Sequence, residues 1–214
     1  MTLAEVGELF LPRHCAGCGA PGSVLCRTCR TELAALPRRV SPQHLPHVPV
    51  FALGPYGGAH RGVVLAMKER RNLAVRKHVG AVLDAALTFL EVRGEIQPGA
   101  RLVPAPTRAA SARERGGDPV SVICKRTGRS VADVLELADS TTDQSELDAA
   151  HRRANLVGAV RMRRGWEALQ AGPGAGPVIV VDDVVTTGAT LQTSVEVLLA
   201  HGFDVVSCVA VCAA

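Results

Sequence analysis

Residues 178–190 read VIVVDDVVTTGAT, and this stretch decides the fold that the sequence predicts. It opens with residues 178–181, which predict a strand too uniformly apolar to have one face in water. An acidic pair, Asp182 and Asp183, begins a predicted polar turn, and apolar residues on one face predict a helix over Ala189–Ala200. A buried strand that passes directly into a helix is typical of an α/β protein with a largely parallel sheet.

Shorter apolar runs predict the other strands of this sheet, and helical periodicity lies between them. Strands are predicted around residues 48–53, 102–105, 160–162 and 205–211, and a strand or mixed segment over 131–137. Helices are predicted over residues 27–36, over 63–90 with a break near Asn72, and over 120–124. Residues 138–157 are polar and lack periodicity, which predicts a mobile loop, and residues 170–177 form a predicted glycine- and proline-rich linker.

The predicted turn carries groups that suit a phosphorylated sugar. Thr186, Thr187, Gly188 and Thr190 supply hydroxyls and a flexible backbone, whose N–H groups can close on a phosphate with help from the helix dipole. Two adjacent carboxylates suit the vicinal hydroxyls of a sugar, whereas they would repel a phosphate alone. The turn therefore predicts a holder for ribose 5-phosphate, and the alternative is a solvated acidic turn followed by a helix cap.

Two other phosphate-binding motifs are excluded. No G-x-x-x-x-G-K-[ST] stretch occurs in the sequence, and no G-x-G-x-x-G stretch follows a predicted strand. The pattern D-D-x-x-T-T-G-x-T, placed between an apolar strand and a helix, is instead similar to the signature of type I phosphoribosyltransferases. This resemblance implies a parallel sheet flanked by helices, and it implies phosphoribosyl pyrophosphate as the ligand, with Mg²⁺ bound through ligand oxygens.

The same resemblance implies roles for individual residues. It implies that Asp182 and Asp183 hold the ribose hydroxyls and act as the catalytic pair. It implies that the 5-phosphate is held by the residues that follow, which are Val185, Thr186, Thr187, Gly188, Ala189 and Thr190. A second loop, PAPTR at residues 104–108, matches by position the loop that holds pyrophosphate, and its candidate contacts are Pro106, Thr107 and Arg108. An ordinary proline-rich turn is the alternative there.

The order of several separate stretches resembles the ComF family of phosphoribosyltransferase-like proteins, over nearly the whole chain. The stretches are the four-cysteine N-terminus, YGGAHRGVVLAMK at 56–68, residues 102–108, RERG at 113–116, DQSELDAAHRRAN at 143–155, and the loop at 178–190. The resemblance implies a link to competence and DNA uptake. One departure is Gly117-Asp118-Pro119, where the family has an aromatic residue, Asn and Gln.

This family resemblance adds three candidate residues around the ligand. It implies that Lys68 faces the mouth of the active site, although a solvated helix lysine is the alternative. It also implies that Gln144 and Arg152 lie in a hood loop that closes over the ligand and excludes water. A plain solvated loop is the alternative for these two residues.

Four cysteines near the start have the spacing C-x2-C-x7-C-x2-C, and they are Cys15, Cys18, Cys26 and Cys29. Two chelating turns of this kind are typical of a tetrahedral zinc site, and without an export signal a metal is favoured over disulfides. A disulfide pair or a rubredoxin-like redox site is the alternative. Residues 1–37 are predicted as a zinc-binding unit, since so short a unit has little core without a metal.

Prolines at positions 42, 46 and 49 predict an extended linker over residues 38–50, and residues 51–214 are predicted as the phosphoribosyltransferase-like domain. The chain has 214 residues, 47% of them hydrophobic and 21% charged, which suits one sizeable core. We expect a soluble, cytoplasmic protein, because no apolar run approaches the roughly 20 residues that span a bilayer and no basic signal region opens the chain.

The net charge is +4, carried mainly by arginine, and fits an anionic ligand or a genomic preference for arginine codons. The leading hypothesis is a phosphoribosyltransferase that uses Mg²⁺ and whose acceptor is undetermined. The alternative is a protein that senses phosphoribosyl pyrophosphate without catalysis and binds single-stranded DNA during uptake. One tyrosine, one tryptophan and four phenylalanines weigh against it, because bases usually stack on aromatic side chains.

Overall fold

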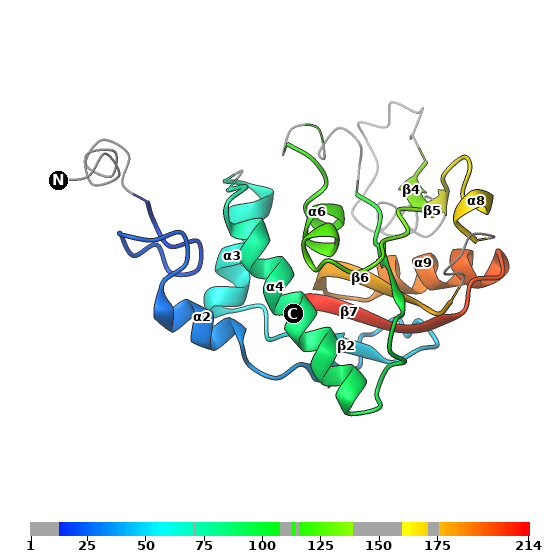
Figure 1. The fold of residues 1–214 in the computed structure, drawn as a ribbon, viewed down its shortest axis with the longest axis horizontal. Helices are drawn as coiled ribbons and strands as arrows, with labels where there is room; N and C mark the ends of the chain where they lie inside the picture. Colours follow the sequence, from blue (N-terminus) through cyan, green and yellow to red (C-terminus); the bar gives the residue numbers. More distant parts are fainter. Residues whose placement is uncertain (1–12, 71, 108–112, 114–115, 139–159, 171–175) are drawn as a thin grey trace.

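The computed structural model describes residues 13–70, 72–107, 113, 116–138, 160–170 and 176–214. A five-stranded sheet in the order β1-β2-β7-β6-β3 forms its centre (Figure 1). Strands β2 (Val50–Ala52), β7 (Val205–Ala213), β6 (Val178–Val185) and β3 (Arg101–Pro104) run parallel to one another. Strand β1 (Arg38–Val40) lies antiparallel at one edge. The predicted α/β class with a largely parallel sheet is confirmed.

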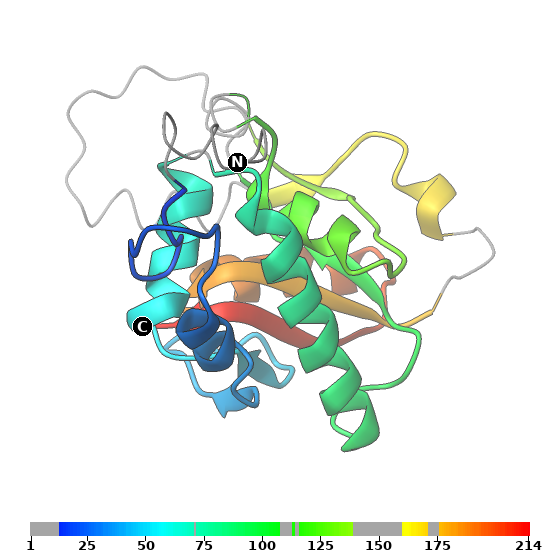
Figure 2. The same cartoon turned by 60° about the vertical axis from the view of Figure 1, so that its left-hand side comes forward.

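Both faces of the sheet are covered, which explains why β7 and the first four residues of β6 are almost wholly apolar. One face carries α3 (Gly58–Lys68), α4 (Val75–Val92) and α6 (Pro119–Arg126). The other face carries α9 (Ala189–Ala200) and a small antiparallel pair, β4 (Leu135–Leu137) with β5 (Val160–Met162). The short helix α8 (Glu167–Gln170) follows β5. Figures 1 and 2 show α4 and α9 on opposite sides of β6 and β7.

Strand β6 is longer than the sequence predicted. The prediction ended the strand at Val181 and placed both aspartates in a turn, whereas β6 continues to Val185. The reason is the neighbouring strand β7, which pairs along the whole of this extension, with Asp182 opposite Ala210 and Val185 opposite Ala213. The acidic pair therefore belongs to the sheet, and the turn consists of the residues after it.

The segment over residues 38–50 does more than link two units. Arg38–Val40 form β1 and pair with β2, because these three residues precede the first proline and keep their N–H groups for the sheet. Val50, the last residue of the expected linker, already belongs to β2. The predicted linker therefore differs from the structure at residues 38–40, which pair in the sheet, whereas Val50 falls within the strand that was predicted around residues 48–53.

The cysteine-rich part of the chain is joined to the sheet through α3. Helix α2 (Arg27–Leu33) does not form a separate hydrophobic core. Its buried residues Cys29 and Leu33 lie in the same apolar cluster as residues of α3 and α4. A Cβ atom at Gly62 would lie 2.0 Å from the carbonyl oxygen of Gly17, so only glycine allows this close approach. The carboxylate of Glu32 accepts the N–H of Ala59 at 2.8 Å, at the start of α3.

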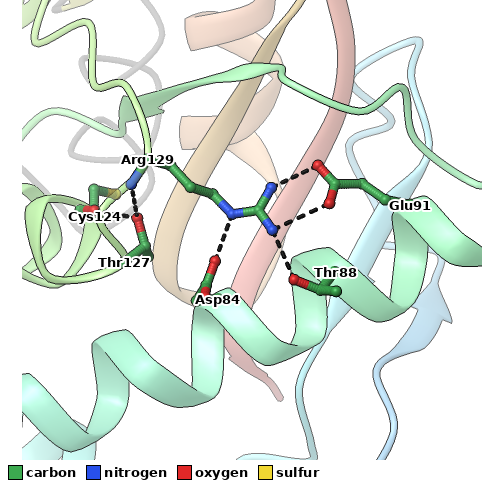
Figure 3. A network of polar contacts seen from close by, with 6 residues as sticks. All are labelled: Asp84, Thr88, Glu91, Cys124, Thr127 and Arg129. Atoms are coloured by element: carbon green, nitrogen blue, oxygen red, sulfur yellow. Dashed lines mark hydrogen bonds and ion pairs between the residues drawn. The ribbon is translucent and has the colours of Figure 1, made fainter.

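Arg129, in the turn after α6, fixes that helix to α4 (Figure 3). Its Nε lies 2.6 Å from Asp84, one Nη atom lies 2.5 Å from Glu91, and the other donates to Thr88 at 2.9 Å. Hydrogen bonds to Glu91 raise the pKa of the Arg129 guanidinium. Both acidic side chains of α4 are therefore engaged on the side of the helix that faces this turn.

The polar stretch that was predicted as a mobile loop lies, apart from residue 138, outside the described residues, as do 171–175 of the predicted glycine- and proline-rich linker. Where the chain is described, no helix combines the length and the apolar character that crossing a membrane requires.

Candidate ligand site and candidate metal centre

The loop between β6 and α9 is shaped by one glycine. Gly188 caps α9 with φ of 86°, in the left-handed region that glycine adopts without strain. A Cβ atom here would also lie 2.4 Å from the carbonyl oxygen of His44 and 2.7 Å from Cβ of Pro42. The N–H of His44 in turn donates to the carbonyl of Thr187 at 2.8 Å. Residues 42–44 therefore support the loop from outside, which sequence spacing could not show.

This loop encloses a hollow of about 30 Å³, lined by Asp182 and by residues 184–191. The first N–H groups of α9 have no partner within the helix, and the positive end of the helix dipole lies in the same place. Thr186 and Thr187 are exposed, and Thr187 Oγ1 accepts the N–H of Ala189 at 3.5 Å, so both hydroxyls can still donate to a ligand. The hollow can hold a single oxyanion, such as one phosphate group, at a helix N-terminus.

The two aspartates point to opposite sides of the sheet, because successive side chains of a strand alternate. Asp182 lines the hollow on the side of α9. Asp183 is only 6% exposed and points toward α3, where its Oδ1 lies 2.8 Å from Nζ of Lys68. The prediction from the sequence gave both aspartates the same role, as acceptors of hydrogen bonds from ribose hydroxyls. In the structure Asp182 lines the hollow, whereas Asp183 pairs with Lys68.

The carboxyl group of Asp182 has a pKa well above its ordinary value. Burial raises the pKa of Asp182 to about 7, and the neighbouring Asp183 charge acts in the same direction. The N–H of Asp183, which donates to Asp182 Oδ1 at 2.7 Å, and the Lys68 charge act to lower that pKa. A carboxyl group with a pKa near neutrality can accept or donate a proton at physiological pH, as active sites often require.

The remaining candidate residues at this edge are placed in part. Lys68 is the last residue of α3, and its side chain reaches Asp183. Pro106 is buried and Thr107 is half-buried, just after β3 and next to the end of β6 in the sheet. Three further candidates, Arg108, Gln144 and Arg152, lie outside the described residues.

The second candidate site is the four-cysteine cluster, whose Sγ atoms all lie within 4.8 Å of one another. The Sγ atoms of Cys18 and Cys26 are 3.8 Å apart, and the N–H of Cys26 donates to Cys15 Sγ at 3.3 Å. A tetrahedral zinc ion with Zn–S bonds of about 2.3 Å needs sulfur atoms roughly 3.8 Å apart. The donor set and its spacing therefore fit a structural zinc ion. All seven cysteines are free.

The four thiols do not share one environment. Burial acts to raise the pKa of Cys15, but N–H groups of Cys26, Cys18 and Gly17 outweigh it and lower the pKa to about 6. Cys29 has a raised pKa, because it is buried and lies close to the other three thiols. N–H groups around Cys15 already favour the thiolate form that a metal ligand needs.

The described residues form no comparable set of side chains for binding Mg²⁺. Among the described residues, the four cysteines form the only group of three or more metal-ligating side chains that lie close together. Asp182 is the only described carboxylate that lines the hollow, and Asp183 points to the other side of the sheet, where it is paired with Lys68. The described residues therefore do not fit an all-protein Mg²⁺ site.

Comparisons with known proteins add no identification: neither the family models nor the curated proteins contain a match to this chain. The resemblance to ComF proteins consequently stays a prediction that rests on the quoted sequence motifs.

Proposed function

We propose that this protein binds phosphoribosyl pyrophosphate and acts as a phosphoribosyltransferase. The observation that carries the proposal is the loop at the end of β6, where a carboxyl group and a helix N-terminus line one hollow. A sugar phosphate needs both features within a few ångströms, an acceptor for hydroxyl groups and a set of N–H donors for phosphate. The sequence order D-D-x-x-T-T-G-x-T supports the same assignment.

In this proposal the 5-phosphate occupies the hollow, where the N–H groups of residues 187–190 and the hydroxyls of Thr186 and Thr187 surround it. Asp182 accepts hydrogen bonds from the ribose hydroxyls in its ionised form. Because its pKa is about 7, a ligand that prefers the carboxylate binds more tightly as the pH rises through neutrality.

Transfer of the ribosyl group breaks the bond between C1 and pyrophosphate, leaving positive charge on the ribose ring and negative charge on the departing pyrophosphate. Carboxylates next to the ring stabilise the first charge, and preorganised donors stabilise the second. Lys68 is a cation at this edge of the sheet, and Thr107 follows the adjacent strand β3. Magnesium, when bound through the oxygens of the ligand, neutralises further negative charge.

We also propose that the four cysteines hold one zinc ion with a structural role. The ion would fasten the described N-terminal residues to α3, which in turn contacts the acidic pair through Lys68. Zinc ligation by four thiolates leaves no open position for a substrate, so this ion would supply rigidity alone.

Isothermal titration calorimetry with phosphoribosyl pyrophosphate and Mg²⁺ tests the main proposal. Wild-type protein should release heat on binding, and Asp182→Asn should lose most of the affinity at pH 8. Asp204→Asn is a matched control, because this exposed residue lies just before β7, at the amino-terminal ends of the parallel strands and away from the hollow. No binding by the wild-type protein, or equal affinity in Asp182→Asn, would refute the proposal.

Turnover is tested separately from binding. Pyrophosphate release is measured with a panel of purine and pyrimidine bases and simple amines as acceptors. Release that depends on one acceptor and disappears in Asp182→Asn supports a transferase. Tight binding without acceptor-dependent release supports a sensor of the same ligand.

A further inference from the structure

Helix α4 carries a second apolar stripe in addition to the one that faces the sheet. On its core-facing side, Val79, Leu83 and Leu90 are at most 1% exposed. The second stripe consists of Ala81, Val82, Ala85, Phe89 and Val92. Their spacing of three, four and seven residues places them along one side of the helix. Val92 is 83% exposed, so part of this stripe lies in water.

The end of α2 and the chain after it form the opposite wall of a groove along this stripe. The groove, called the α2–α4 groove below, is lined by residues 33–37 and by residues 81, 82, 85, 86 and 89, and it encloses about 300 Å³. Leu36 on its rim is 61% exposed. Figure 2 shows α2 beside α4, and the residues that line the groove come from the end of α2, the chain after it and the middle of α4. This is a concave apolar surface of the kind that receives a helix.

Basic side chains gather at one end of this groove. Arg30 belongs to the last turn of α2, and Lys77 and His78 belong to the first turns of α4. Burial lowers the pKa of His78, and the nearby charges of Lys77 and Arg30 lower it further, so Lys77 and Arg30 supply the positive charge at this end of the groove. His78 is four residues before Val82, so this basic group adjoins the apolar stripe.

The acidic side chains of both helices are engaged away from the groove. Glu32, the acidic residue of α2, accepts the N–H of Ala59 at the start of α3. Asp84 and Glu91, the acidic residues of α4, bind Arg129 on another side of that helix (Figure 3). The positive charge beside the groove is therefore not balanced by the helices that form it.

We propose that the α2–α4 groove binds an amphipathic helix with an acidic polar face, supplied by another protein. Ala81 and Phe89 are about 12 Å apart along α4 at 1.5 Å per residue, which matches apolar anchors spaced over two turns of a docked helix. A second copy of this chain would bring two basic rims together, so charge favours an acidic partner over self-association. This inference is independent of the proposed phosphoribosyltransferase activity.

Two synthetic amphipathic peptides test the proposal by fluorescence anisotropy with the full chain. Both peptides form about five helical turns and have the same leucine face. The polar face carries glutamate in one peptide and lysine in the other. The glutamate peptide should bind roughly tenfold more tightly. Ala85→Asp should weaken that binding roughly tenfold, because the change puts an acid into the groove at an exposed position that has no role in the core.

Ala200→Asp is the matched control, an exposed alanine at the end of α9 that should leave peptide binding unchanged. The double change Arg30→Glu/Lys77→Glu should reverse the preference toward the lysine peptide, with unchanged zinc content and melting temperature showing that the fold is intact. Failure of both peptides to bind, equal binding of the two, or insensitivity to Ala85→Asp would overturn the proposal.

Other occupants of the groove give different results, and each result would overturn the proposal. Dimerisation in analytical ultracentrifugation that Ala85→Asp abolishes would identify a second copy of the chain. An increase in glutamate-peptide affinity in Glu5→Lys/Glu8→Lys would identify the chain's own residues 1–12 as the occupant. Binding to anionic lipid vesicles that Ala85→Asp abolishes, without peptide binding, would identify a membrane surface.

Discussion

The two candidate sites lie on either side of α3 and are built in opposite ways. The four cysteines converge from two short turns, and N–H groups around Cys15 stabilise the charged form of that thiol. At the hollow beside β6, burial disfavours the charged form of Asp182, and Gly188 holds a backbone conformation that other residues adopt only with strain. We therefore expect the first site to stabilise the fold and the second to be maintained at a cost in stability.

The difference between the two sites predicts how a substitution at each of them changes the free energy of unfolding. Removal of a metal ligand should weaken the protein, because metal binding and folding are coupled. Removal of the perturbed carboxyl group should strengthen the unliganded protein, as at other sites where function and stability compete. Stability measurements can therefore distinguish the roles of the two sites without knowledge of the substrate.

The largest expected effect is loss of the metal centre. Cys26→Ala should remove one equivalent of zinc and lower the free energy of unfolding by about 4 kcal/mol, since metal binding contributes directly to folding in small zinc units. This corresponds to a fall in melting temperature of about 10 °C for a protein of this size. Elemental analysis and calorimetry measure the two quantities.

Cys208→Ala provides the control, because Cys208 is fully buried in β7 and lies outside the cluster. This variant also loses some packing, but it should keep its zinc and its sensitivity to a chelator. If Cys26→Ala retained a full equivalent of zinc, Cys26 would not be a zinc ligand and the contrast between the two sites would not hold.

The next effect concerns the glycine that caps α9. Gly188→Ala should lower the free energy of unfolding by about 3 kcal/mol, because a left-handed alanine costs about 1–2 kcal/mol and the segment over residues 42–44 must also move. Phosphate affinity should fall in the same variant. Gly94→Ala is the matched control, since φ is 70° there and a Cβ atom would meet nothing within 4 Å. Equal urea midpoints for the two variants would show that residues 42–44 do not support the loop.

The third effect has the opposite sign. The pKa of Asp182 in the folded protein, about 7, lies above its ordinary value of 3.8, so stability is lost as the pH rises from about 4 to 7. Asp182→Asn should remove this loss and raise the free energy of unfolding at pH 8 by on the order of 2 kcal/mol, with no gain at pH 4. Urea denaturation across this pH range measures it. If Asp182→Asn were less stable than the wild-type protein at pH 8, the ionised Asp182 carboxylate would not be destabilising the fold.

The smallest effect is expected at the ion pair between the two sites. Lys68→Gln leaves the Asp183 carboxylate without its partner and should lower the free energy of unfolding by about 1 kcal/mol. Because the Lys68 charge lowers the pKa of Asp182, that pKa should rise in the variant, which a carboxyl titration by nuclear magnetic resonance detects. Lys77→Gln removes an exposed lysine of α4 and should leave the Asp182 titration where it is.

Much of the fold follows from local sequence patterns. Continuous apolar runs located β6 and β7, and helical periodicity located α3, α4 and α9 with the break near Asn72. The cysteine spacing predicted a cluster that the structure brings together. These predictions succeed because each depends on residues that are close in the sequence, where strand burial, helix periodicity and chelating turns leave a direct pattern.

The misses depend on contacts between distant segments. The acidic pair was assigned to a turn, because polarity within the sequence could not reveal that β7 pairs with that part of β6. The segment over residues 38–50 was predicted from its prolines, which say nothing about a neighbour such as Gly188. The pairing of Lys68 with Asp183 likewise left no signal in either local motif.

The position of β7 has a consequence for how the chain is made. This strand follows the other described strands in sequence, yet it lies between β2 and β6 in the sheet. A ribosome releases the cysteine unit and α3 before β7, so β2 and β6 gain their shared neighbour only once β7 has emerged. Metal loading can therefore precede closure of the sheet, and a nascent chain without β7 exposes apolar strands that attract chaperones.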